Sequence, residues 1–162
     1  MIVMKSLSGQ NHKLAKAEHQ LSYLRTDKTT AFDDKLREIG LFPLKPTSLD
    51  IFQINLGKMC NQVCKHCHVD AGPDRKEIMT RETMSECLAA LEHTNAHTVD
   101  LTGGAPELNP DFRWFVEQLS SKQKKIIVRC NLTIILANKK FHDLPSFFRD
   151  HEVEVISSLP YF

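Results

Sequence analysis

Three cysteines within eight residues constrain this chain more than any other feature of its sequence. Cys60, Cys64 and Cys67 are separated by three and then by two residues. Packing gives no reason to gather three thiols so closely, whereas a metal centre needs a short loop that directs several thiolates at it. Zinc remains an alternative, because His66 or His68 could supply a fourth ligand. An iron–sulfur cluster is favoured, because no second Cys-x-x-Cys pair exists and three thiolates leave one iron of a cubane open for chemistry.

Strand and helix patterns alternate along the chain around these cysteines. The expected strands are 49–56, 97–102, 126–130 and 153–156. The expected helices begin at the capping residues Thr80 and Asn109, the second with Pro110 at its first position, and a weaker helix lies at 145–149. Apolar residues recur at helical spacing at Met84, Cys87, Leu88 and Leu91, and again at Phe112, Phe115, Val116 and Leu119. This β-α-β-α-β-α-β order predicts an α/β fold with a parallel sheet.

Unusual residues follow each expected strand directly. The four segments are the cysteine loop, Gly103-Gly104-Ala105-Pro106-Glu107, Cys130-Asn131-Leu132-Thr133 and Ser158-Leu159-Pro160-Tyr161. In parallel α/β proteins the carboxyl ends of the strands share one edge of the sheet, and ligands bind there. The sequence therefore predicts that these four segments form one site.

The chain is expected to divide into three parts. Residues 1–30 are polar and patternless and predict a disordered tail, and residues 31–48 predict a short helix followed by a connector. Phe32, Leu36 and Ile39 share one face of that helix, which Gly40 can close. Residues 49–162 form the core, which ends just after the fourth expected strand. Four strands do not close a barrel, so we expect an incomplete barrel with an exposed apolar edge.

Composition excludes several classes of partner. The formal net charge is +1, which gives no strong field toward nucleic acid, and the apolar runs are shorter than a membrane span. Five cysteines, three of them clustered, indicate a reducing compartment, and the cytoplasm is therefore the expected location.

Several long motifs resemble those of a known family, and the resemblance covers roughly residues 32–162. The motifs are Asn55-Leu56-Gly57-Lys58-Met59-Cys60-Asn61-Gln62, Cys67-His68-Val69-Asp70-Ala71-Gly72-Pro73, Asp100-Leu101-Thr102-Gly103-Gly104-Ala105-Pro106-Glu107-Leu108-Asn109-Pro110, Arg129-Cys130-Asn131-Leu132-Thr133 and Ser158-Leu159-Pro160-Tyr161. They resemble the radical S-adenosylmethionine (radical SAM) enzymes, and most closely the arsenosugar biosynthesis radical SAM proteins. The resemblance implies the first four strands of a partial TIM-like (β/α) barrel.

The resemblance also implies a chemistry. Cys60, Cys64 and Cys67 would hold a [4Fe–4S] cluster whose open iron binds SAM, and reductive cleavage of SAM would release methionine and a 5′-deoxyadenosyl group. The implied substrate is an organoarsenical, and the implied electron donor is a flavodoxin or ferredoxin. Members of the family continue into further barrel units and a C-terminal domain, so activity of residues 1–162 alone is open. The alternative is a metal-binding fragment, with zinc or iron–sulfur, that does not turn over.

Five residues are predicted to contact the cofactor, and no catalytic residue is assigned. Gly103 and Gly104 lack Cβ atoms, so their carbonyl groups can approach the SAM ammonium closely. The superfamily has Gly-Gly-Glu here, whereas this chain has Ala105 at that place and a carboxylate at Glu107. Asn131 could bond the ribose or carboxylate of SAM, or could serve a turn. The fifth is His66, which stands where the superfamily carries an aromatic residue near the adenine.

Other polar residues near the strand ends keep two interpretations each. Asp100 lies inside an apolar strand and needs a partner there, so a structural role is favoured. Arg129 could pair with the SAM carboxylate or form an ordinary ion pair. Cys130 faces either the core or the site, with core packing favoured. His68 is expected to be exposed or beside the cluster, and Cys87 to pack as a small hydrophobe.

Overall fold

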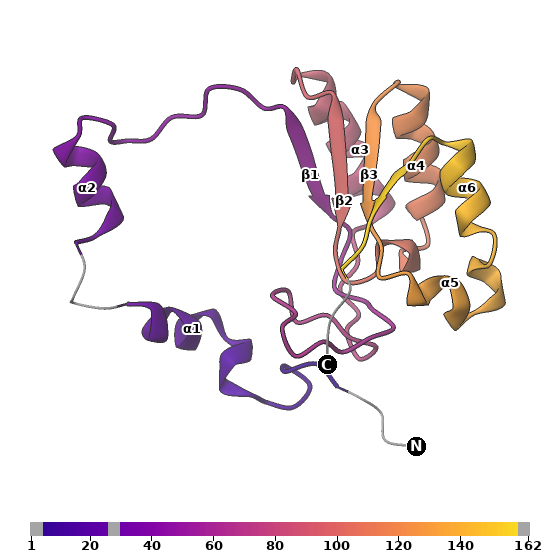
Figure 1. Cartoon of the computed structure of the whole chain (residues 1–162), viewed down its shortest axis with the longest axis horizontal. Coiled ribbons are helices and arrows are strands. Elements are labelled where there is room, and N and C mark those ends of the chain that lie inside the picture. Colours follow the sequence, from indigo (N-terminus) through magenta and orange to yellow (C-terminus); the bar gives the residue numbers. More distant parts are fainter. Residues whose placement is uncertain (1–4, 26–29, 159–162) are drawn as a thin grey trace.

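The chain folds around a four-stranded parallel sheet, seen in a computed structural model that describes residues 5–25 and 30–158 (Figure 1). The strands are β1 (Ile51–Asn55), β2 (Thr98–Thr102), β3 (Lys125–Arg129) and β4 (Glu154–Ile156). They lie in the order β1-β2-β3-β4, and every neighbouring pair is parallel. The predicted α/β class and parallel sheet are confirmed, and the sheet is open rather than closed into a barrel.

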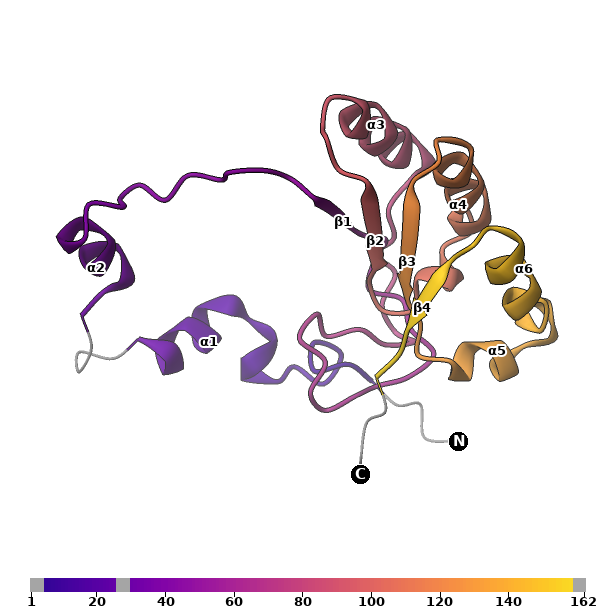
Figure 2. The same cartoon turned by 45° about the horizontal axis from the view of Figure 1, so that its top comes forward.

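Three helices cover one face of this sheet (Figure 2). They are α3 (Arg81–Glu92), α4 (Phe112–Ser121) and α6 (Leu144–Asp150). The Thr80 hydroxyl accepts a hydrogen bond from the amide of Thr83 and caps α3 as predicted. Side chains alternate along each strand, so one set faces the helices. The core consists of Ile54, Val99, Leu101, Ile126 and Val128 from the sheet, packed on the predicted stripes of α3 and α4 and on Leu144 and Phe148.

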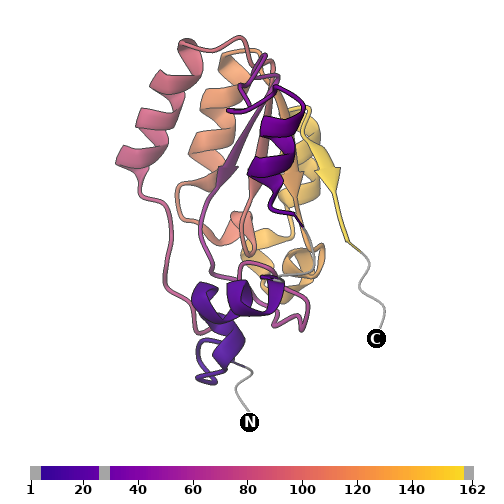
Figure 3. The same cartoon turned by 90° about the vertical axis from the view of Figure 1, so that its left-hand side faces the viewer.

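The opposite face of the sheet carries polar side chains. Gln53 of β1 and Asp100 of β2 are partners in register, and Arg129 ends β3 on the same face. The helices α1 (Ala17–Leu24) and α2 (Phe32–Glu38) stand away from the helical layer, and a long extended connector joins α2 to β1 (Figure 1). Seen from the side of these helices, α2 lies in front of the sheet (Figure 3). Gly40 adopts φ +72° just after α2, as the predicted helix end requires.

The second core helix begins at Phe112, later than the predicted start at Pro110, although Oδ1 of Asn109 accepts from the amide of Asp111 at 2.9 Å and so caps the turn before the helix. Asp111 is the residue that precedes α4, and Asn109 is buried. Its Nδ2 donates to the carbonyl groups of Leu56 and Met79, at 3.2 and 2.9 Å. The Leu56 carbonyl follows β1 and also accepts from the amide of Met79 at 3.0 Å, and the Met79 carbonyl precedes α3. The buried Asn109 amide adds one hydrogen bond to each of them. Asn109 therefore joins both ends of the cysteine-containing segment.

Several short elements were not predicted. They are α5 (Thr133–Ala137) and the 3₁₀ helices η1 (Lys13–Ala15), η2 (Pro106–Leu108) and η3 (Lys139–Phe141). The patternless N-terminal segment contains η1 and α1, and Ser6 is fully buried. The elements α5, η2 and η3 bury side chains and depend on tertiary contacts that periodicity does not encode, whereas η1 and α1 bury no residue. Over the described ranges, no helix has the length and apolar character that a bilayer-spanning helix needs.

Candidate functional site

A cavity of about 450 Å³ opens at the carboxyl ends of the strands. Its wall is built from the segments that follow β1, β2 and β3, together with Ile156 and Ser158 at the end of β4. The lining residues that the sequence had singled out are Cys64, His66, Cys67, His68, Gly103, Gly104, Arg129, Cys130, Asn131 and Ser158. Residues Leu159, Pro160 and Tyr161 of the fourth predicted segment lie outside the described residues.

The cysteine loop is closed at its base by backbone hydrogen bonds. The amide of Cys60 donates to the carbonyl of Gly72 at 3.2 Å, and the amide of Gly72 donates to the carbonyl of Lys58 at 3.1 Å. Residues 61–71 therefore form a loop whose two ends lie side by side. This closure brings Cys60 and Cys67 to the same region, where both pack near Ala71.

The two glycines after β2 let this loop dock. The amide of Gly104 donates to the carbonyl of Gly57 at 3.0 Å, and the next amide, that of Ala105, donates to the carbonyl of Met59 at 2.8 Å. Gly103 has φ +146°, and a Cβ atom there would lie 2.8 Å from the carbonyl oxygen of Gly57. A Cβ atom on Gly104 would lie 2.3 Å from the carbonyl oxygen of Met59. Larger residues would force the turn away from the loop that carries the thiols.

The three thiols differ in burial and in hydrogen bonding. Cys60 is buried, and Cys64 and Cys67 are half-buried. Burial raises the pKa of the Cys60 thiol, and the neighbouring thiols of Cys64 and Cys67 raise it further. Burial also raises the pKa of Cys64. The Cys60 sulfur accepts from the amide of Gln62 at 3.4 Å, and the Cys67 sulfur accepts from the amide of Ala71 at 3.3 Å.

These thiols suit an iron–sulfur cluster in their chemistry and placement. Thiolates are the protein ligands of such clusters, and here three thiols share one loop, of which Cys64 and Cys67 line the cavity and the buried Cys60 does not. Within the described ranges, no three His, Cys, Asp or Glu side chains converge as the ligands of a single ion do. The geometry required of a cubane is different, because each thiolate binds a separate iron. The donor set therefore fits the cluster, and amides already directed at sulfur would stabilise the thiolates.

Asn131 connects the end of β3 to the cysteine loop. Its Nδ2 lies 3.5 Å from the Cys60 sulfur and donates to Oδ1 of Asn61 at 2.9 Å. Asn61 in turn donates from its Nδ2 to the hydroxyl of Thr133 at 2.8 Å. The Asn131 Oδ1 accepts from the amide of Ile134 at 3.1 Å, which is the turn role that the sequence left open. Asn61 and Thr133 are site residues that sequence reasoning missed, because nothing in their spacing marks this contact.

Glu107 does not line the cavity in this structure. Its side chain is 4% exposed, and neither carboxylate oxygen makes a hydrogen bond of ordinary geometry to a described residue, the weak thiol donor of Cys130 being the polar group beside it. Burial raises the pKa of Glu107. The neighbouring Cys130 is also buried, and burial together with the Glu107 carboxylate raises the pKa of its thiol to about 12. The Cys130 side chain therefore packs in the core, which was the favoured interpretation. Cys130 is also one of the residues that line the cavity.

Three side chains from three strands form a polar row at the cavity, with Gln53 and Arg129 in its wall and Asp100 buried between them. Asp100 is buried, and its Oδ2 accepts from Nε2 of Gln53 at 2.9 Å and from Nη2 of Arg129 at 2.8 Å. Burial raises the pKa of Asp100, but the hydrogen bonds from Arg129 and Gln53 outweigh it and leave the pKa below its ordinary value. The structural role favoured for Asp100 is thus supported, and Arg129 is its partner.

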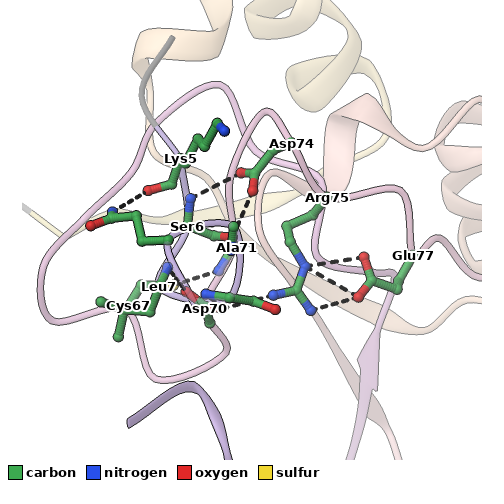
Figure 4. A network of polar contacts seen from close by, with 12 residues as sticks. Lys5, Ser6, Leu7, Cys67, Asp70, Ala71, Asp74, Arg75 and Glu77 are labelled. Carbon is green, nitrogen blue, oxygen red and sulfur yellow. Dashed lines mark hydrogen bonds and ion pairs between the residues drawn. The ribbon is translucent and has the colours of Figure 1, made fainter. Parts of the chain in front are cut away.

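The N-terminal segment binds the far end of the cysteine loop (Figure 4). The amide and hydroxyl of Ser6 donate to the carboxylate of Asp74, at 3.0 and 2.8 Å. The amides of Leu7 and Ser8 donate to the carboxylate of Asp70, at 2.5 and 2.8 Å. Asp70 follows Cys67 by three residues, and its own amide donates to the Cys67 carbonyl at 3.1 Å. Residues 6–8 therefore hold in place the segment that follows Cys67.

Arg75 completes this network from the other side (Figure 4). Its guanidinium group pairs with Asp70 at 2.7 Å and with Glu77 at 2.5 Å, and its side chain is only 12% exposed. The hydrogen bonds from Arg75 lower the pKa of Glu77 to about 2. The polar composition of the first residues gave no signal of this contact.

Comparisons with known proteins do not assign the chain to a family. No protein-family model matches it, and no curated protein matches it either. The functional interpretation therefore rests on the motifs and on the geometry of the cavity.

Proposed function

We propose that this chain is a radical SAM core in which Cys60, Cys64 and Cys67 hold a [4Fe–4S] cluster beside a SAM site. The open sheet would be the first four units of a partial TIM-like barrel. When bound, the reduced cluster supplies the electron that cleaves SAM and makes the 5′-deoxyadenosyl group available to a substrate. By resemblance, the substrate class is an organoarsenical, and the electron donor is a flavodoxin or ferredoxin.

The observation that carries this proposal is the convergence of the separated motifs on one cavity. Cys64 and Cys67 line it together with Gly103, Gly104 and Asn131, although these residues come from the ends of three different strands. An accidental cluster of thiols would have no reason to face a double glycine and a strand-end asparagine. Ligands of open parallel sheets bind at this edge.

The surrounding residues have defined tasks in this proposal. Asn131 orients Cys60 through its amide, and the glycines keep the loop seated against the turn after β2. Residues 6–8 hold the outgoing end of the loop through Asp70. His66 is exposed at the cavity and is free to stack on an aromatic ligand.

Anaerobic reconstitution with ferrous iron and sulfide tests the cluster. We expect about four irons and four sulfides per chain, with visible absorbance that bleaches on reduction. Cys60→Ala, Cys64→Ala and Cys67→Ala should each lose most of this content. Cys87→Ala is the matched control, because Cys87 packs against the core on α3 away from the cavity. Stoichiometric zinc without sulfide, or equal loss in the Cys87 variant, would contradict the proposal.

Turnover is tested separately on the reconstituted protein. Addition of dithionite and SAM should yield 5′-deoxyadenosine and methionine in equal amounts, measured by liquid chromatography. A complete cluster without deoxyadenosine would refute the enzymatic part of the proposal and leave a metal-binding protein without turnover.

A further inference from the structure

Positive charge is concentrated in the N-terminal segment of this chain. Residues 5–25 contain four lysine and arginine residues but only one carboxylate, that of Glu18, whereas the whole chain has a formal net charge of +1. The four cationic residues are Lys5, Lys13, Lys16 and Arg25. All four are exposed, and none of them forms an ion pair with a described residue. A negatively charged partner would therefore be attracted to this segment rather than to the rest of the chain.

Two of these lysines line a second cavity, which has a volume of about 260 Å³. Lys13 and Lys16 share its wall with His12 and His19, and none of the described residues that line it is acidic. Lys13 belongs to η1, and Lys16 is the residue that precedes α1. The segment therefore presents a hollow bordered by several basic side chains rather than isolated surface charges.

This basic cavity adjoins the cysteine loop. Ser8 is one of its lining residues, and the amide of Ser8 donates to the carboxylate of Asp70 at 2.8 Å. Asp70 follows Cys67 by three residues, and its own amide donates to the Cys67 carbonyl at 3.1 Å. In Figures 1 and 2 the N-terminal segment lies at the same end of the sheet as the cysteine loop. A partner bound at this cavity would be next to the loop that carries the proposed cluster ligands.

We propose that residues 8–19 form the docking surface for the electron donor and that this donor is a small acidic one-electron carrier protein. The inference rests on the proposed function, because the cluster must receive its electron from outside the chain. One electron passes from the reduced carrier to the cluster, so the carrier is oxidised and the cluster reduced by one electron, and no bond forms or breaks. The motifs within residues 32–162 do not account for this surface.

Charge and location together favour such a partner over other anions. An acidic carrier complements the basic surface, and charge complementarity speeds encounter and sets orientation. Electron carriers need only a small and transient interface, so a short basic segment is sufficient. The basic side chains lie beside the cysteine loop and outside the cavity proposed for SAM. This position suits a protein that approaches the loop from outside better than it suits a substrate.

Binding to the full chain without iron is measured first, with a purified flavodoxin and a purified ferredoxin in turn as the acidic carrier. Affinity should fall as salt is raised, because exposed charges are screened over about 10 Å at 0.1 M ionic strength. Lys13→Glu combined with Lys16→Glu should weaken binding at least about tenfold at low salt.

Lys139→Glu combined with Lys140→Glu is the matched control and should bind as the wild type does. These two lysines are exposed, and their replacement changes the net charge by the same amount. They lie in η3, between α5 and α6, on the opposite side of the molecule from α1 (Figures 1 and 2).

Electron delivery is measured second, by stopped-flow absorbance on the reconstituted protein. The reduced carrier should bleach the cluster of the Lys13→Glu, Lys16→Glu protein at least about tenfold more slowly than that of the wild type. Dithionite is a small reductant that needs no docking surface, so it should bleach both proteins at similar rates.

Several results would overturn the docking surface. They are failure of both carriers to bind, wild-type affinity in the Lys13→Glu, Lys16→Glu protein, an equal loss in the control, and binding of a DNA duplex as tight as that of the carrier. A protein that dithionite does not bleach would instead refute the proposed cluster. Because the binding measurement uses the chain without iron, the two failures are distinguishable.

Discussion

Replacing Glu107 with methionine tests whether the buried carboxylate costs this fold stability. Methionine has nearly the same length and no ionisable group. Glu107 is 4% exposed, and neither carboxylate oxygen makes a hydrogen bond of ordinary geometry to a described residue. A buried polar group that lacks a partner costs about 1–3 kcal/mol. The variant should therefore be more stable than the wild type by about that amount at pH 8, which corresponds to roughly 2–4 °C in melting temperature per kcal/mol.

The difference between the two proteins should depend on pH. Burial raises the pKa of Glu107 above its ordinary 4.5, so the folded state binds a proton that the unfolded state has lost. Between the ordinary and the raised pKa, the wild type loses stability as pH rises, by at most about 1.4 kcal/mol per pH unit. The methionine variant lacks this contribution. Its advantage should be largest at pH 8 and should shrink toward pH 4.5.

Urea unfolding of both proteins between pH 4.5 and 8, followed by circular dichroism, measures this difference. Glu107→Gln separates the effect of charge from that of polarity, because the amide is neutral but still polar. Glu117→Met is the matched control, since Glu117 is exposed on α4 and should show no pH-dependent difference. If Glu107→Met were less stable than the wild type at pH 8, or if the difference did not change with pH, the Glu107 carboxylate would be stabilised in the fold rather than costing stability. A confirmed cost would mark Glu107 as a residue retained for function at the expense of stability.

Three further predictions concern Asp74, Asp100 and the cysteine thiols. Asp74→Ala removes the two hydrogen bonds that Asp74 accepts from Ser6 and leaves those at Asp70, so trypsin should cleave within residues 5–25 faster than in the wild type, while an unchanged rate would show that Asp74 does not hold the segment. Asp100→Asn should lower the free energy of unfolding by about 1.5–3 kcal/mol in urea at pH 7. Because the folded pKa of Asp100 is lowered, this contribution is present at neutral pH and is lost as pH falls through that value, so the two proteins should converge in acid. At pH 8 iodoacetamide should label Cys64 and leave Cys130 unmodified, because the Cys130 thiol is buried with a pKa of about 12; peptide mass spectrometry that finds both labelled equally would contradict this.

Much of the fold could be read from local patterns in the sequence. The Thr80 cap, the apolar stripe of α3 and the four strands all appear where periodicity and capping chemistry place them. Parallel pairing followed from the alternation of strand and helix, because only crossovers connect parallel strands. The short helix α5 was missed, since five residues are too few to show a helical period.

The site was predictable where its residues follow strands and unpredictable where its contacts join distant segments. The cysteine loop, the double glycine and Asn131 line one cavity because parallel strands end at one edge. Glu107 looked like part of the same edge but turns into the core within η2. Asn109 was assigned to a cap because Asn-Pro is a good helix start, and its Oδ1 does accept from the amide of Asp111, but the helix begins only at Phe112, and the Asn109 amide donates to two carbonyls of another segment.

The sequence by itself determined the order of the elements, the class of the sheet and the set of thiols. Those features depend on residues within a few positions of each other, and local periodicity records them. Only the tertiary structure decided that Ser6 binds Asp74 across 68 residues, and that Gln53, Asp100 and Arg129 share one row. Such pairings depend on the register of the strands and on which buried polar groups still lack a hydrogen-bond partner. Neither can be predicted from the sequence of one segment alone. The three cysteines are therefore a local signal, whereas the contacts that Asn61, Asn131 and residues 6–8 make with their loop belong to the fold.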